Sequence, residues 1–312
     1  MLLTKTLFSF IPYDYLFFNQ TQPKMTTTSG DILVMSYNIS FEAMTNNSHG
    51  SAGALGAKCH PVKPGSRLTI CAKNMADMID NVPSSLGKTN FDFVGMQEAS
   101  RWTEMQGAST LLSQLKSHGS KYGRSEMVSF YDGSKYQLDK HVDSGFEHDR
   151  PFQILVFSET SGSGGVIFLN AHCPHHLPDN NMPYTWTEFS KHASKAIKTI
   201  ALTDHEKTYR IISVGDFNET QWNMGDRKLE PKHFMPFGPE YIKTPIAIKD
   251  TPFTCCQGNG VWEDHNGKRL DGWRGGDYIF DSNSPANAQV PKTYPANKLL
   301  SDHLPVIAML PK

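Results

Sequence analysis

The sequence predicts an α/β domain in which short buried strands alternate with amphipathic helices. Short apolar runs end at Gly, Ser, Asn or Asp, which is typical of buried strands. Other segments carry apolar residues at the three- and four-residue spacing of a helix. Because the two patterns intermix along the chain without an internal repeat, we expect strands and helices to form one layered domain.

The expected strands begin just after residue 30. The first is the apolar run Ile32–Met35, which leads into Ser36-Tyr37-Asn38. Two later runs are joined through a Gly- and Ser-rich turn at 161–165, which predicts that they pair. The later expected strands span residues 91–96, 152–157, 166–169, 211–214, 278–280 and 306–308.

Three helices are expected from apolar periodicity. The first carries apolar residues from Cys71 to Val82, the second from Ala108 to Leu115, and the third from Phe189 to Ile200. Residues 42–65 are rich in Gly, Ser, Asn and Ala and show no periodicity. We expect them to form a long loop, and loops of that length are usually functional or disordered.

Residues 1–30 are expected to form a flexible N-terminal extension, and residues 31–312 a single domain. The first part of the extension is rich in Leu, Phe and Tyr, but Lys5, Pro12 and Asp14 interrupt it. It therefore matches neither a transmembrane helix nor a signal peptide. Of the remaining alternatives, we favour a flexible or loosely docked segment over a membrane-surface anchor.

Composition describes an ordinary soluble globular protein, with 38% hydrophobic and 20% charged residues. A net charge of −1 argues against a tight nonspecific nucleic-acid binder, although a nuclease can rely on a local patch and a metal. The five cysteines are scattered, contain no CxxC motif, and include the adjacent pair Cys255 and Cys256. We therefore expect reduced cysteines, an intracellular (cytoplasmic or nuclear) location and no zinc site.

Polar side chains cluster at the ends of the expected strands. Because strand ends are rigid mounts, several of them together could build a site along one edge of the sheets. Carboxylate and amide oxygens suit Mg²⁺ or Mn²⁺, whereas histidines suit proton transfer near neutral pH. The residues at these positions are Asn38, Glu98, His172, Asp216, Asn218, Asp277, Asp302 and His303.

Taken as six short motifs, these residues resemble the endonuclease/exonuclease/phosphatase superfamily, which includes deoxyribonuclease I. Each string alone is weak support, but all six occur in the family's order between residue 31 and the C-terminus. The resemblance implies a four-layer sandwich, with two packed mixed β-sheets flanked by helices. The motifs are Ser-Tyr-Asn38, Gly-Met-Gln-Glu98, Leu-Asn-Ala-His172, Gly-Asp216-Phe-Asn218, Gly-Asp277-Tyr-Ile-Phe and Ser-Asp302-His303-Leu-Pro.

The resemblance also implies a metal centre. Glu98 matches the main metal ligand, Asn38 lies beside it, and Asp302 matches a carboxylate on the metal side. The cofactor is expected to be Mg²⁺ or Mn²⁺. Taken singly, Asn38 could instead cap a turn and Glu98 could be an ordinary loop carboxylate.

Proton transfer and phosphate contacts are implied for the other residues. His303 resembles a general base that activates water, with Asp277 orienting its ring. Asp216 and Asn218 resemble groups that position the nucleophile and phosphate, or hold a second metal. His172 resembles a group that contacts the phosphate. Singly, either histidine could be a structural residue and Asp216 a turn former.

Substrate contacts are less determined. Arg150 is expected to bind phosphate, with a structural ion pair as an equal alternative, and Trp222 could stack on a base or only pack a loop. The same alternatives apply to Trp102 and Trp273. The Cys-Asp-Arg signature of inositol polyphosphate 5-phosphatases is absent here, which counts against a close relative of those enzymes.

The function expected from these residues is Mg²⁺-dependent phosphoester hydrolysis, with a phosphodiesterase or nuclease preferred. A phosphatase or phospholipase-type hydrolase of a small or lipid phosphate is the alternative. An inactive binding module is the alternative from another class, although the complete residue set argues against it. We expect a monomer that takes a phosphate-ester substrate, with nucleic acid or a nucleotide as candidates.

Overall fold

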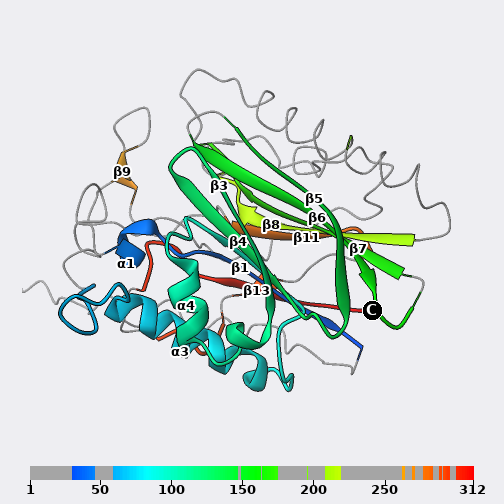
Figure 1. Cartoon of the computed structure of the whole chain (residues 1–312), viewed down its shortest axis with the longest axis horizontal. Coiled ribbons are helices and arrows are strands. Elements are labelled where there is room, and N and C mark those ends of the chain that lie inside the picture. The colour runs from blue at the N-terminus through cyan, green and yellow to red at the C-terminus, as the bar shows by residue number, and fades with distance from the viewer. Residues whose placement is uncertain are drawn as a thin grey trace, which may run out of the picture.

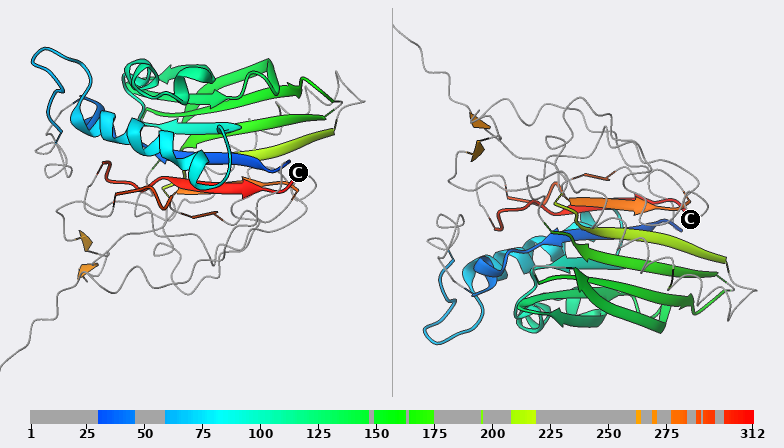
Figure 2. Two further views of the ribbon diagram at one scale, coloured as in Figure 1. Left: turned by 90° about the horizontal axis from the view of Figure 1, so that it is seen from below. Right: turned by 90° about the horizontal axis from the view of Figure 1, so that it is seen from above.

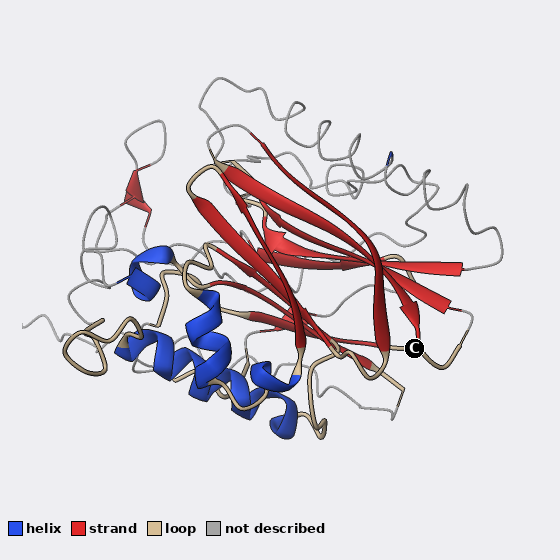
Figure 3. Ribbon diagram, in the orientation of Figure 1, coloured by secondary structure: helices blue, strands red, loops and turns tan. Residues whose placement is uncertain are grey.

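Two mixed β-sheets pack face to face, with helices beside one of them, in the computed structural model of the chain (Figure 1, Figure 3). The predicted class of two packed mixed sheets is therefore confirmed. The structure describes residues 30–45, 59–146, 149–162, 164–174, 195, 208–218, 262–263, 269–270, 277–283, 288–289, 291–295 and 300–312.

The first sheet brings the two ends of the described chain together at its centre. β1 runs parallel to β2 and antiparallel to β13, and it lies beside β13 in both views of Figure 2. The order across the sheet is β12 (Ala288–Gln289), β13 (Val306–Leu310), β1 (Ile32–Asn38), β2 (Phe93–Gln97), β4 (Ser125–Tyr131) and β3 (Lys116–Tyr122).

The second sheet repeats the same alternation, with one parallel pair flanked by antiparallel neighbours. β7 and β8 are parallel, and β6 and β7 form the hairpin expected from the Gly-rich turn. The order is β11 (Asp277–Asp281), β8 (Thr208–Asp216), β7 (Gly164–His172), β6 (Arg150–Glu159) and β5 (Tyr136–Phe146). A separate two-stranded ladder joins β9 (Trp262–Glu263) and β10 (Arg269–Leu270).

Alternation along β1 separates two hydrophobic layers. Leu33, Met35 and Tyr37 belong to the layer that packs against the helices, whereas Ile32 and Val34 belong to the layer between the sheets. This follows from the two-residue period of a strand, which sends successive side chains to opposite faces. The strand is buried along its whole length because both of its faces are covered.

Helix α3 (Ile70–Ser85) confirms the first predicted helix. It buries Met75, Ile79 and Val82 against the first sheet, at the spacing from which it was predicted. Thr69 caps its N-terminus, since the threonine Oγ1 accepts a hydrogen bond from the Ala72 amide at 3.0 Å.

The prediction of a second helix from Ala108 to Leu115 was wrong. Helix α4 (Trp102–Ala108) ends where it was expected to begin, and only the 3-10 turn η2 (Leu112–Gln114) follows. The Asp80 carboxylate explains the break: it accepts hydrogen bonds from the Thr110 and Leu111 amides at 2.8 and 3.0 Å and also contacts the Ser109 hydroxyl. These groups therefore bond to a side chain instead of continuing a helix.

The loop expected at 42–65 also needs correction, because helix α1 (Phe41–Thr45) occupies its start. Residues 46–58, the extension before residue 30 and, apart from Lys195, the helix expected at 189–200 lie outside the described part of the chain. The extension and the domain limits remain predictions. Within the described segments, no helix combines the length and apolar character needed to cross a membrane.

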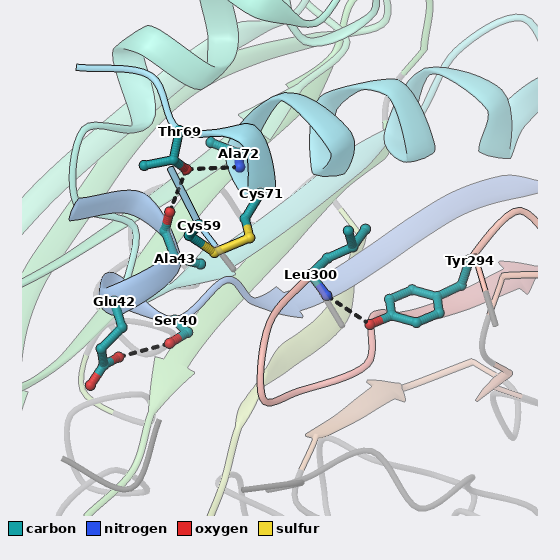
Figure 4. Close-up of a disulfide and its surroundings, with 9 residues drawn as sticks. All are labelled: Ser40, Glu42, Ala43, Cys59, Thr69, Cys71, Ala72, Tyr294 and Leu300. Carbon is teal, nitrogen blue, oxygen red and sulfur yellow. Dashed lines mark hydrogen bonds between the residues drawn. A yellow bond between two sulfur atoms is a disulfide. The ribbon is translucent and has the colours of Figure 1, made fainter. Parts of the chain in front are cut away.

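A disulfide joins Cys59 to Cys71, contrary to our expectation of reduced cysteines (Figure 4). The pairing was missed because Cys59 lies in an irregular segment and Cys71 in a helix, so no sequence motif links them. Beside it, the Thr69 hydroxyl donates to the Ala43 carbonyl at 2.5 Å. The disulfide ties the segment at Cys59 to the first turn of α3, and the hydrogen bond ties α1 to the residue that caps α3.

Candidate active site

Strand register brings the predicted polar residues to one edge of the two sheets. Asn38 and Gln97 end the parallel pair β1 and β2 as direct partners. In the other sheet, His172 and Asp216 end the parallel pair β7 and β8. Asp277 opens β11 opposite Asp216, since that pair is antiparallel. The carboxyl ends of both parallel pairs therefore contribute to the same site.

Asn38 lies at the centre of this cluster and is fully buried. Its amide Nδ2 donates to Asp216 Oδ2 at 2.9 Å. The same nitrogen lies 3.4 Å from Glu98 Oε1 and 3.4 Å from His303 Nε2. The Asn38 Oδ1 accepts from the Ser40 amide at 3.0 Å, which fixes the side chain in this orientation. Asn38 thus links carboxylates from both sheets.

His303 and Asp277 form a buried pair. The Nδ1 atom of His303 lies 2.9 Å from Asp277 Oδ2, while its Nε2 lies 3.6 Å from Asp216 Oδ2. The Ser301 hydroxyl donates to the Asn38 carbonyl at 2.8 Å and accepts from the His303 amide at 3.1 Å. The segment before β13 is therefore anchored to the end of β1.

His172 and Arg150 place positive or protonatable nitrogens on the other side of the cluster. His172 Nε2 lies 3.6 Å from Glu98 Oε1 and 3.5 Å from Asp216 Oδ2. Arg150 Nη1 lies 3.6 Å from the same Glu98 oxygen and contacts the His172 ring. The structure thus brings Arg150, from the start of β6, to the residues with which it was grouped on sequence alone.

Asn218 and Asp302 lie at the margins of the cluster. The Asn218 amide donates to Asp216 Oδ1 at 2.9 Å, and its side chain donates to the Cys173 carbonyl at 2.6 Å. Asp302 is partly exposed and lies 3.4 Å from the Ser301 hydroxyl. Asn218 therefore holds Asp216 in place, whereas Asp302 adds negative charge at the rim.

Aromatic residues proposed for stacking have different positions. Trp102, the first residue of α4, is partly buried against the core, with its ring edge-on to Phe130 at a centroid distance of 6.2 Å, and a side chain at Gly119 would collide with it. Trp102 thus has a packing role, although it packs against strands β3 and β4 and not against a loop. Trp222 and Trp273 lie outside the described residues.

Burial and charge shift the pKa values of two residues in the cluster. Burial raises the pKa of Asp216, and the nearby Asp277 carboxylate adds to this, against the opposing effects of His303 and Asn38. Burial alone would lower the pKa of His303, but Asp277 and Asp216 outweigh it and hold that pKa well above its ordinary value. The buried histidine is therefore poised to carry a proton among carboxylates.

The cluster could hold a divalent metal ion. Its oxygen donors, Glu98 and Asp216 foremost, concentrate negative charge in a largely buried region, and such charge needs a cationic partner. Glu98 remains 23% exposed, so an ion can reach it. Asp216, Asp277 and His303 also offer ligand atoms within 4.8 Å of one another. Carboxylate-rich sets of this kind suit hard divalent cations.

Two residues near the site were missed on sequence. The Ser40 hydroxyl donates to Glu42 Oε2 at 2.7 Å (Figure 4), and burial raises the pKa of Glu42, with Glu98 and Asp302 as like charges nearby. A backbone signal marks this region, because Ser40, Glu98 and Asn218 all have positive φ without being glycine. Such outliers cluster at functional sites, but they are visible only in the structure.

Comparison with curated proteins finds a related sequence. It is the uncharacterized protein L684 of Acanthamoeba polyphaga mimivirus, 26% identical over 193 residues that cover 60% of this chain and 34% of the viral protein. The chain thus spans about a third of the length of this curated relative. No family model matches the sequence.

Solved structures are similar over nearly the whole chain at low identity. A mannosyl-6-phosphatase of Bacteroides thetaiotaomicron is 18% identical with a TM-score of 0.55, and the match covers 90% of this chain and 100% of that one. An endonuclease/exonuclease/phosphatase of Bacteroides vulgatus is 16% identical with a TM-score of 0.54, covering 90% and 98%. The human Nocturnin catalytic domain, solved with a sulfate anion, is 12% identical with a TM-score of 0.50, covering 90% and 93%.

These likenesses concern the path of the backbone, and they agree with the sequence motifs from which the same superfamily was expected. The chain has the fold of the endonuclease/exonuclease/phosphatase proteins.

Proposed function

We propose that this chain is a Mg²⁺-dependent phosphoesterase, acting on a phosphodiester. The carrying observation is the buried His303–Asp277 pair at 2.9 Å, with the far nitrogen of the ring directed at the carboxylate and amide cluster. A histidine held this way has one tautomer and one ring orientation, which is what a general base for water requires.

The metal would be held by Glu98, with Asn38 and Asp302 beside it. When bound, the ion would supply charge neutralisation and Lewis acidity to the phosphate. For Asn38 to be a ligand, its amide oxygen would have to face the ion, in exchange for the present hydrogen bond to Ser40. In its present orientation Asn38 instead steers the carboxylates of Glu98 and Asp216.

The raised pKa of His303 favours a protonated ring in the metal-free protein, and a cation bound beside the same carboxylates would oppose that shift. His303 would then take the proton of the attacking water through Nε2, while Asp277 stabilises the charged ring that results. Asp216, bridged by the Asn38 amide and the Asn218 backbone, would orient the water and the phosphate. Neither step needs covalent participation by the protein, since phosphoryl transfer depends mainly on alignment and charge stabilisation.

His172 and Arg150 would bind the phosphate oxygens. His172 is buried, and Arg150 keeps 18% of its side chain exposed beside it, so both can face a bound anion. Donors aimed at the oxygens stabilise the charge that develops in the transition state. Arg150 would thus contact the phosphate in addition to its contacts with Glu98 and His172.

A phosphomonoesterase is the second candidate. The observation that favours it is the likeness to the Bacteroides thetaiotaomicron mannosyl-6-phosphatase, together with the phosphate contacts proposed for His172 and Arg150. Diester and monoester substrates differ in the charge on phosphorus oxygens and in the leaving group, so simple chromogenic substrates separate the candidates.

The test compares bis-p-nitrophenyl phosphate with p-nitrophenyl phosphate in Mg²⁺, in Mn²⁺ and after chelation with EDTA. We expect turnover of the diester that requires the metal. A panel of single-stranded DNA, RNA, cyclic dinucleotides, phosphoinositides and sphingomyelin then identifies the natural class. Preference for the monoester would favour the second candidate, and metal-dependent binding without hydrolysis of any substrate would favour an inactive binding module.

Glu98→Gln is the matching variant. We expect it to weaken metal dependence and to lower turnover by about 10²-fold or more, because it removes the charge that the ion needs. Glu104→Gln, a partly exposed carboxylate on α4, serves as the control. Wild-type turnover in Glu98→Gln would show that the ligand assignment is wrong.

A further inference from the structure

We propose that His118, His141 and Asp143 form a second metal site, separate from the candidate active site, for a transition ion of the Zn²⁺ class. The three side chains come from the edge strands of the two sheets: His118 from β3, and His141 and Asp143 from β5. One ligand atom from each lies within 4.8 Å of the other two.

The donor atoms are already spaced for a small ion. His118 Nε2 lies 2.9 Å from Asp143 Oδ2, and His141 Nε2 lies 3.7 Å from the same oxygen. Ligands at about 2.0–2.1 Å from a tetrahedral zinc lie roughly 3.3–3.4 Å apart. These two distances bracket that value, and the ligand atoms of His118 and His141 lie within 4.8 Å of each other.

The chemistry of the donors selects the class of ion. Two imidazole nitrogens and one carboxylate oxygen suit Zn²⁺ and its neighbours in the first transition row. Mg²⁺ prefers oxygen ligands, so it should not compete at this site. Water would complete the coordination, since His141 and Asp143 keep 52% and 31% of their side chains exposed.

The strand beneath His118 is held in place from within the protein. Gln153, on β6, donates from Nε2 to the His118 carbonyl at 3.2 Å and to the Ser120 hydroxyl at 2.9 Å. Its Oε1 accepts from the Ser129 hydroxyl at 2.7 Å. The first ligand is therefore mounted on a backbone that is fixed to both sheets, which reduces the ordering needed to bind an ion.

The consequence is a link between two sheet edges. β3 ends the first sheet and β5 ends the second, and each has a neighbour on one side only among the described strands. An ion shared by the two strands would close the sandwich at this edge. In the metal-free protein, the same residues form a histidine–carboxylate ion pair, which is the alternative that the experiment must exclude.

The test uses the full chain, stripped with a chelator and titrated with Zn²⁺ in excess Mg²⁺ against a chromophoric zinc indicator. His141→Ala and Asp143→Asn are the variants, and His60→Ala, another exposed histidine, is the matched control. We expect wild type and His60→Ala to bind one more equivalent of Zn²⁺ than either site variant. Zinc should also raise the Tm of wild type more than that of His141→Ala.

Co²⁺ substitution gives a second readout, because its visible absorption depends on the ligands and geometry of its site and is strongest in four-coordinate sites. The band owed to this site should disappear in His141→Ala and persist in Glu98→Gln, whereas Mg²⁺-dependent hydrolysis should respond in the opposite way. Equal zinc stoichiometry in wild type and both site variants, with circular dichroism showing that all are folded, would overturn the proposal and leave only the ion pair. The result does not depend on the proposed hydrolase activity.

Discussion

Replacing Gly95 by alanine should disturb the candidate site without touching any residue in it. Gly95 lies in β2 and faces the other sheet. A Cβ atom there would lie 2.4 Å from Val214 Cγ2 and 3.0 Å from Asn170 Cγ. The absence of a side chain at this position is thus what allows β2 to approach β7 and β8.

The size of the effect follows from those distances. Carbon atoms in contact lie about 3.5–4.0 Å apart, so the sheets would have to separate locally by roughly 1.1–1.6 Å. Overpacking of this kind costs about 1–3 kcal/mol of stability. Each contact lies two residues from the site along its strand, since Asn170 precedes His172 and Val214 precedes Asp216. A displacement of about 1 Å in a catalytic constellation can lower turnover ~10²-fold.

Two measurements on Gly95→Ala check this. Urea unfolding should show the loss of stability, and metal-dependent diester hydrolysis at saturating substrate should show the loss in kcat. The control is Gly107→Ala in α4, where an added Cβ meets nothing within 4 Å. That variant should be neutral or gain up to about 1 kcal/mol, because alanine is the better helix former.

The reasoning would be refuted if Gly95→Ala matched Gly107→Ala in both assays. A stability loss with unchanged kcat would show that the sheets accommodate the methyl group away from the site. In that case the alignment of His172 and Asp216 with Asn38 does not depend on the spacing of the sheets.

Further outcomes concern the proton pair and the disulfide. His303→Ala and Asp277→Ala should each lower kcat about 10²–10⁴-fold. The double variant should be little worse than the worse single variant, because the effects of groups that act as one unit are non-additive. Additive losses of kcat in steady-state kinetics would show that the two residues act independently. The pKa of His303 is raised in the fold, so the stability it contributes is full below pH ~6.5 and is lost as pH rises through the higher folded value. In EDTA, wild type should therefore lose more stability than His303→Gln between neutral and alkaline pH, and equal slopes of Tm against pH would contradict this. The cysteines of the Cys59–Cys71 disulfide are 12 residues apart, so on the chain-entropy model its reduction should lower the free energy of unfolding by about 3 kcal/mol. In urea titrations, the double variant Cys59→Ser/Cys71→Ser should be destabilised by the same amount and should not respond to reductant.

Much of the fold could be predicted because its central strands are buried on both faces. Strands such as β1 and β2 are marked by apolar runs for that reason. The edge strands β3 and β5 were not predicted, since they are largely exposed and their sequences are mostly polar. Edge strands carry little hydrophobic signal, and their pairing depends on neighbours distant in sequence.

The residues of the candidate site that lie at strand ends could be predicted from the sequence. Asn38, His172 and Asp216 end strands, so register alone brings them together. Ser301 could not be predicted, because its role is a hydrogen bond to a carbonyl 263 residues away in sequence. The expectation of no zinc site rested on the cysteines alone, because His118 and Asp143 lie on different sheets and form no sequence motif.

Strand β13, which pairs with β1, is synthesised long after β1 itself. Residue 306 follows residue 38 by 306 − 38 = 268 positions, which corresponds to roughly 13–54 s of translation at ~5–20 residues/s. During that interval the apolar β1 has an unpaired edge, a condition that favours aggregation and chaperone binding. Since His303 arrives with the same late segment, a nascent chain lacks its proposed base until β13 docks. Incomplete chains, including any truncated before residue 303, would thus lack the proposed hydrolytic activity.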